Sequence, residues 1–118
     1  MSLAEIKQNI FDISIEYQKL FSPGGKPLFD DDNFLYDDLI EKALLLIFSF
    51  CAANKIKIEG YDFQKLSIND PDNEDYFWWD VVNEMLLNIS EGKIQTPQVL
   101  KELILYFEEC FYDFNALP

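Results

Sequence analysis

Carboxylates make up most of the side chains in this chain that could do chemistry. The 118 residues include 22 Asp and Glu against nine lysines, and they include no histidine and no arginine. Without imidazole, the chain lacks the commonest general base and metal ligand near neutral pH. Without guanidinium, it lacks the group that holds a phosphate or carboxylate with two parallel hydrogen bonds. The composition therefore argues against most enzymes, and it leaves acid–base catalysis by carboxylates alone as an alternative.

Acidic side chains gather in two windows that contain no lysine. Six lie between Lys26 and Lys42, and they are Asp30, Asp31, Asp32, Asp37, Asp38 and Glu41. Seven lie between Lys65 and Lys93, and they are Asp70, Asp72, Glu74, Asp75, Asp80, Glu84 and Glu91. Each window includes the predicted start of a helix, where one or two carboxylates cap free amides and complement the helix dipole. The remaining acids repel one another, so two interpretations stand: capping alone, or capping together with a surface that binds a partner.

Neither acidic window has the spacing of a metal site. A calcium-binding EF-hand loop needs a glycine at its sixth position and a glutamate at its twelfth. A loop that starts at Asp30 has Leu35 at the sixth position, and one that starts at Asp70 has Asp75 there. Two distant cysteines cannot supply the three or four ligands of a zinc site. The sequence predicts no metal centre and no cofactor, with weak cation binding by clustered carboxylates as the alternative.

Four consecutive aromatic residues, Tyr76 to Trp79, follow the second acidic run. On a helix they would spread around the circumference, so they cannot all face one core. One interpretation places Phe77 and Trp78 in the core, with Tyr76 or Trp79 at its half-exposed edge. The other makes Trp79 or Tyr76 the anchor of an interface, since aromatic groups ringed by polar ones dominate many protein interfaces. The candidate partner-binding residues are Asp72, Glu74, Asp75, Tyr76, Trp79 and Asp80, followed by Asp31, Asp37 and Asp38.

The spacing of apolar residues predicts the helices that must position these side chains. Ser2 and Glu5 match a capping box, and apolar residues three and four apart follow them. A second helix begins amphipathic and becomes apolar all round, as a central core helix does. Asp70-Pro71 and Thr96-Pro97 each combine a cap residue with proline at the first helical position. The predicted helices span residues 3–21, 33–54, 71–91 and 97–114. Gly92 is the expected stop of the third. The expected inward face of the fourth consists of Leu100, Leu103, Ile104, Phe107, Cys110, Phe111 and Phe114.

Residues 55–70 form the longest predicted connection. The alternation from Lys55 to Glu59 has the period of a strand, but a lone strand would have nothing to pair with. The apolar residues that follow are expected to anchor a packed loop or a single helical turn, and they are Tyr61, Phe63, Leu66 and Ile68. Long connections in compact domains are often functional. The pattern as a whole predicts an all-α fold, with one domain over residues 1–118 built as a bundle of about four helices.

The cysteines and the apolar segments indicate where the protein works. Cys51 and Cys110 lie inside apolar helical patterns, which predicts buried free thiols in a reducing compartment, with a disulfide as the alternative. The N-terminal region carries charges in its first turns, unlike a secretory signal. The longest apolar stretch, residues 43–53, is too short to span a bilayer. We expect a soluble cytoplasmic protein that binds neither membranes nor nucleic acid, because both are negatively charged.

The acidic runs at residues 30–32, 37–38 and 70–75, in a small helical chain without catalytic residues, resemble the profile of bacterial toxin-immunity proteins. The resemblance is to the colicin, contact-dependent-inhibition and polymorphic-toxin types, and it covers the profile of the whole chain rather than a motif. It implies a protein that binds a basic nuclease-type toxin and blocks its active site or substrate groove. The residues alone support a broader hypothesis, an acidic face that engages a basic protein. The alternatives are an adaptor that docks through an apolar helical face, or a small carboxylate enzyme or ligand-binding bundle.

Overall fold

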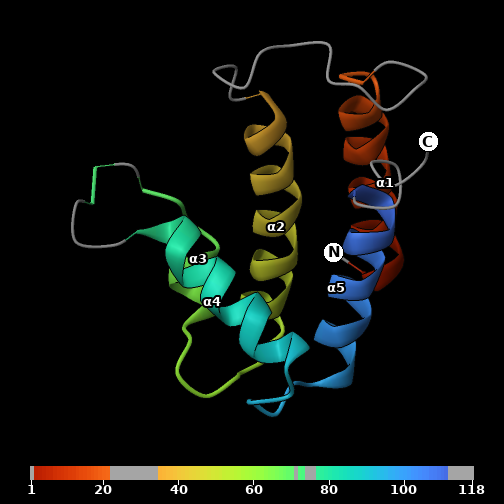
Figure 1. Cartoon of the computed structure of the whole chain (residues 1–118). Coiled ribbons are helices and arrows are strands. Elements are labelled where there is room, and N and C mark those ends of the chain that lie inside the picture. Colours follow the sequence, from red (N-terminus) through yellow and green to blue (C-terminus); the bar gives the residue numbers. More distant parts are fainter. Residues whose placement is uncertain (1, 22–34, 71, 74–76, 112–118) are drawn as a thin grey trace.

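Five helices form the framework of the computed structural model, which describes residues 2–21, 35–70, 72–73 and 77–111. They are α1 (Leu3–Gln18), α2 (Leu35–Ala53), α3 (Phe63–Leu66), α4 (Trp78–Ser90) and α5 (Gln98–Phe111). In Figure 1, α1 and α5 run side by side in the same direction, and α2 runs the opposite way beside them. α3 and the start of α4 lie on the other side of α2 (Figure 1). The predicted all-α bundle is confirmed.

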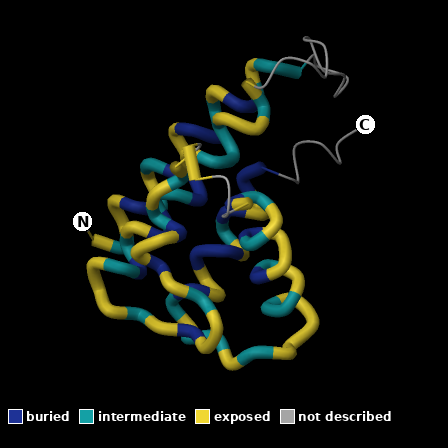
Figure 2. The backbone as a smooth tube through the Cα atoms, turned by 90° about the vertical axis from the view of Figure 1, so that its left-hand side faces the viewer, coloured by how far each residue is buried: buried dark blue, intermediate teal, exposed yellow. Residues whose placement is uncertain are grey.

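α2 is the central helix of the core, as its apolar second half predicts. Its enclosed residues are each at most 1% exposed, and they are Ala43, Leu44, Ile47, Phe48 and Cys51. The ring of Phe48 packs against Phe63 of α3 and Trp78 of α4, with centroids 6.0 and 6.2 Å away. One cluster of buried side chains contains residues from all five helices. Figure 2 shows the buried stretches of the chain turned toward this common interior.

The outer helices bury the stripes that their spacing predicts. On α1 the buried apolar residues are Ile6, Ile10, Ile13 and Tyr17. On α5 they are Leu100, Leu103, Ile104, Phe107, Cys110 and Phe111. α5 begins immediately after Pro97, whose carbonyl accepts from the amides of Leu100 and Lys101, so the Thr96-Pro97 signal correctly locates its start. The predicted extension of this helix to residue 114 lies outside the described residues beyond Phe111.

Three predicted helix ends are confirmed in their hydrogen bonds. The Glu5 amide donates to the Ser2 hydroxyl oxygen at 3.2 Å, as the capping box requires. α2 ends where Lys55 takes a left-handed conformation (φ 57°) and the Ile56 amide donates to the Cys51 carbonyl at 2.9 Å. α4 ends in the same way at Gly92 (φ 70°), a conformation that glycine adopts without strain.

The predicted start of the third long helix at Asp70-Pro71 is wrong. The Asp70 carboxylate accepts from the Asp72 amide at 3.0 Å, which closes a turn instead of capping a helix. α4 starts at Trp78, and its N-cap residue Phe77 makes no side-chain capping hydrogen bond. The physical reason is a long-range contact: Trp78 is buried, and its indole Nε1 donates to the Leu66 carbonyl at 2.9 Å. Burial of this side chain with its polar group satisfied overrides the local cap signal.

The 55–70 connection contains one helical turn. α3 is capped by Asp62, whose carboxylate accepts from the Gln64 amide at 2.9 Å. Phe63 and Leu66 are buried, as expected for its anchors. Ile68 is 66% exposed, so the expectation that it anchors this segment is wrong. The strand-like alternation before α3 yields only an isolated bridge between Ile58 and Tyr61.

Both cysteines are buried and neither forms a disulfide, which matches the predicted state of Cys51 and Cys110. Burial raises the pKa of the Cys51 thiol to about 12. A thiol in this state is protonated at neutral pH and is a poor nucleophile. Among the helices described, none combines the length and the apolar character needed to cross a bilayer.

We expect Phe48→Ala to lower the free energy of unfolding by about 3–5 kcal/mol, because it leaves a cavity between α2, α3 and α4. Leu105→Ala is the control, since Leu105 is 59% exposed and its loss should cost less than about 0.5 kcal/mol. Urea denaturation measures both, and Phe48→Leu serves if the alanine variant does not fold. Equal losses for Phe48→Ala and Leu105→Ala would contradict the central position of α2.

Cys51 should make the protein less stable at alkaline pH. The folded thiol has a pKa of about 12 against an ordinary 9.0, so above pH 9 the unfolded chain loses a proton that the folded chain keeps. The stabilising contribution is complete below pH 9 and falls as the pH rises toward 12. Between pH 8 and pH 10 we expect a loss of about 1 kcal/mol through this group. Denaturation of the wild type and of Cys51→Ala at both pH values isolates the effect, and parallel losses in the two proteins would rule it out.

Candidate partner-binding surface

The first turn of α2 presents two of the predicted carboxylates to solvent. Asp37 and Asp38 are exposed, and Asp31 lies outside the described residues. The hydroxyl of Tyr36 donates to the Leu20 carbonyl at 3.2 Å, which ties this turn to the end of α1. Carboxylates at this position complement the positive end of the helix dipole. Their exposure leaves them available to a partner as well.

Glu41 links the two acidic windows. It lies one turn beyond Asp37 on α2, and its carboxylate accepts a hydrogen bond from the Asn69 side-chain amide. Asp70 and Asp72 follow Asn69 directly, and both are exposed. The contact therefore attaches the start of the second window to the helix that carries the first. Nothing in the sequence marks this pair, because the two residues are 28 positions apart.

The start of α4 supplies the remaining described candidates. Trp79 is half-buried, and its ring stands nearly perpendicular to that of Trp78 at 4.8 Å between centroids. Asp80 is exposed in the first turn. Trp79 thus occupies the half-exposed edge that the first interpretation of the aromatic run predicts. Glu74, Asp75 and Tyr76 lie outside the described residues.

Phe77 is 69% exposed, so its predicted place in the core is wrong. Because α4 begins one residue later, Phe77 has extended backbone (φ −86°, ψ 91°) and lies before the first helical turn. Of the two residues that were expected in the core, only Trp78 is buried there. In the sequence, the exposed Phe77 and the exposed Ile68 flank residues 70–75.

The described candidate carboxylates are not neutralised by lysines. In the part of the chain that the structure describes, ion pairs join Lys7 to Glu102 at 2.6 Å and Lys93 to Glu91 at 2.8 Å. Neither pair involves Asp37, Asp38, Asp72 or Asp80.

Those candidate carboxylates that the structure describes are also too dispersed to hold a metal ion between them. Across residues 2–21, 35–70, 72–73 and 77–111, no three acidic or thiol side chains come close enough together to hold a metal ion. The described arrangement suits recognition of positive charge over an extended surface. It brings the two windows together at one contact and does not merge them into a single cluster.

Comparisons of this chain with protein-family models, with curated proteins and with solved structures found no match. The candidate surface therefore rests on the residues and geometry of this chain alone.

We expect Glu41 and Asn69 to be energetically coupled. Asn69→Ala and Glu41→Ala should each lower the free energy of unfolding by about 1 kcal/mol, since each removes one partner of a partly buried, charge-assisted hydrogen bond. The double variant should lose less than the sum, with a coupling of at least about 0.5 kcal/mol. A double-mutant cycle by urea denaturation measures this, and strictly additive losses would show that the contact does not hold the two windows together.

Proposed function

We propose that this chain is an acidic interaction protein that binds and neutralises a basic protein partner. The observation that carries the proposal is a set of exposed carboxylates, at the start of α2 and around the start of α4, that pair with no lysine among the described residues. The chain has a formal net charge of −13, which attracts a basic protein and speeds its encounter. Trp79 would contribute apolar contact at the edge of this surface.

The partner that fits best is a nuclease-type toxin. Such enzymes bind nucleic acid through basic surfaces, and a field of carboxylates competes for the same lysines and arginines. The chain would then act as a bacterial immunity protein in the cytoplasm, where it protects the cell from the toxin. The chain's overall resemblance to toxin-immunity proteins supports this assignment.

A second candidate function is an adaptor that docks through apolar contacts. The observation in its favour is the exposure of Ile68 and Phe77, at 66% and 69%, beside the acidic segment. The two functions respond differently to salt. Electrostatic capture weakens markedly between about 50 and 500 mM salt, because the Debye length shrinks, whereas apolar docking changes little.

The test uses the basic toxin domain expected to be encoded beside the gene for this chain. The wild-type chain should inhibit that domain and restore growth of cells that produce it. Asp37→Lys with Asp38→Lys should raise the dissociation constant at least about tenfold, since two attractive contacts become repulsive. The matched control is Asp12→Lys with Glu16→Lys, which makes the same change in charge on exposed positions of α1 and should alter binding by less than about threefold.

Three results would count against the proposal. Equal loss in both double variants would mean that net charge acts without a defined surface. Binding that persists unchanged at high salt would favour the adaptor. A neighbouring gene for a metabolic enzyme, with no basic toxin domain, would overturn the immunity assignment.

A further inference from the structure

Lysines gather at the end of the molecule opposite the first turn of α2. An open hollow of about 830 Å³ is lined by Lys57, Lys93 and Lys101, three of the nine lysines in the chain. Its other polar lining includes Glu59, Gln95 and Thr96. Its lining residues come from the connection after α2, the connection between α4 and α5, and the start of α5, and these segments lie at the lower end of the bundle in Figure 1. We call this site the lysine hollow.

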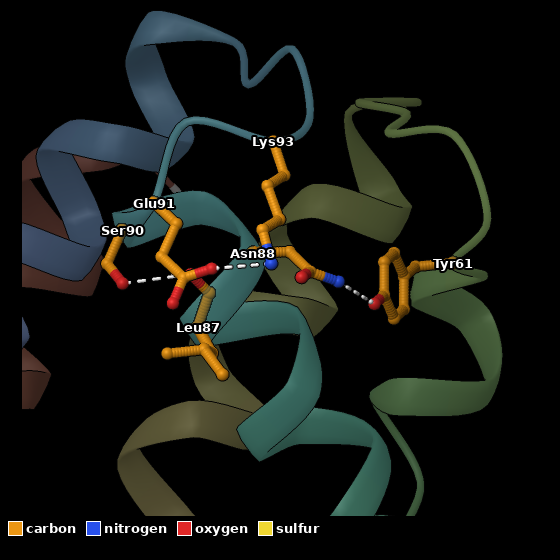
Figure 3. A network of polar contacts seen from close by, with 6 residues as sticks. All are labelled: Tyr61, Leu87, Asn88, Ser90, Glu91 and Lys93. Atoms are coloured by element: carbon orange, nitrogen blue, oxygen red, sulfur yellow. Dashed lines mark hydrogen bonds and ion pairs between the residues drawn. The ribbon is translucent and has the colours of Figure 1, made fainter.

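The first wall comes from the strand-like alternation after α2. Ile58 is 5% exposed and packs into the core, so the residues on either side of it, Lys57 and Glu59, are directed outward and are exposed. The bridge between Ile58 and Tyr61 fixes this turn, and the Asn88 side chain donates to the Tyr61 hydroxyl at 3.0 Å, which attaches the turn to α4. Figure 3 shows this contact beside the end of α4.

The other two lysines come from the connection after α4 and from α5. Lys93 follows Gly92, and its ammonium group pairs with Glu91 at 2.8 Å (Figure 3). Lys101 lies in the first turn of α5, which contains no acidic residue. The helix dipole does not stabilise a positive charge at this end of the helix. Within the described residues, Lys57 and Lys101 form no ion pair, so their positive charges are not neutralised.

We propose that the lysine hollow is a binding site for a compact, multiply charged anion of the phosphate or phosphate-monoester type. Lysines from three separate segments line one hollow, and lysine binds phosphate as a point charge without needing a planar partner. The volume is within the range of small-molecule sites. The positive end of the α5 dipole adds to the attraction.

Three features oppose anion binding and set its expected strength. Glu59 lines the hollow, and the net charge of −13 repels anions at long range. Glu91 also competes for Lys93. Binding of a free phosphate ion is therefore weak, and removal of the Glu91 charge should strengthen it. If the pair of Lys93 and Glu91 had only a structural role, removal of the Glu91 charge would not strengthen phosphate binding.

The experiment is a titration of the full chain with inorganic phosphate at constant ionic strength, followed by amide NMR shifts of Gly92, Lys93 and Thr96. Concentrations up to about 20 mM cover dissociation constants in the millimolar range. We expect saturable shifts, at least a fivefold weaker affinity in Lys101→Gln, and a tighter affinity in Glu91→Gln. Lys42→Gln is the matched control, because Lys42 is exposed on α2 away from the hollow, and its affinity should stay within twofold of the wild type.

Further ligands identify the anion. AMP that binds more tightly than phosphate would show that the site takes a phosphate monoester, and equal affinities would show that it takes the free ion. The proposal is overturned if no shift saturates, if Lys42→Gln weakens binding as much as Lys101→Gln, or if malonate, a dianion of similar size, binds as tightly as phosphate. These outcomes are independent of the acidic surface, whose variants lie on the first turn of α2.

Discussion

The enclosure of α2 is the constraint on which the rest of the structure depends. Its second half is apolar around its whole circumference, and burial of apolar surface stabilises a fold by about 25 cal/mol per Å². The helix is therefore packed between α1 and α5 on one side and α3 and α4 on the other, and in its second half only Ser49 and Ala53 are exposed. The charged residues of α2 all lie in its first half, and its second half carries none. The acidic surface begins at its first turn, and the lysine hollow begins just beyond its last.

Sequence patterns correctly predicted those features that depend on interactions between residues close together in the chain. The stripe of Ile6, Ile10 and Ile13 predicted the buried face of α1, and the glycine at residue 92 predicted the end of α4, because both signals act within a few residues. The start of α4 was predicted wrongly for the opposite reason. The contact that decides it, from Trp78 to Leu66, crosses twelve residues and competes with a good local cap. Phe77 is exposed as a consequence of the same contact.

The candidate site shows the same difference between features set by local sequence and features set by long-range contacts. Exposure of Asp37 and Asp38 follows from their positions in the first turn of α2, so the sequence was sufficient to propose them. Asp80 lies in the first turn of α4 only because that helix begins later than predicted. The contact that joins the two acidic windows was not predictable, since neither Glu41 nor Asn69 belongs to a motif. The lysine hollow was also missed. Its three lysines are spread over 45 residues of sequence, and only the meeting of two connections with the start of α5 brings them together.

The length of α2 has a consequence for how its two ends behave in solution. The helix has 19 residues, so it spans about 28 Å. That is more than three times the Debye length of about 8 Å at physiological ionic strength. Salt in the surrounding water therefore screens the field of Asp37 and Asp38 before it reaches Lys57. The charges at the two ends of α2 interact only weakly with each other. One molecule can therefore hold ligands of opposite sign at the two ends, and the charge of one ligand has little effect on the binding of the other.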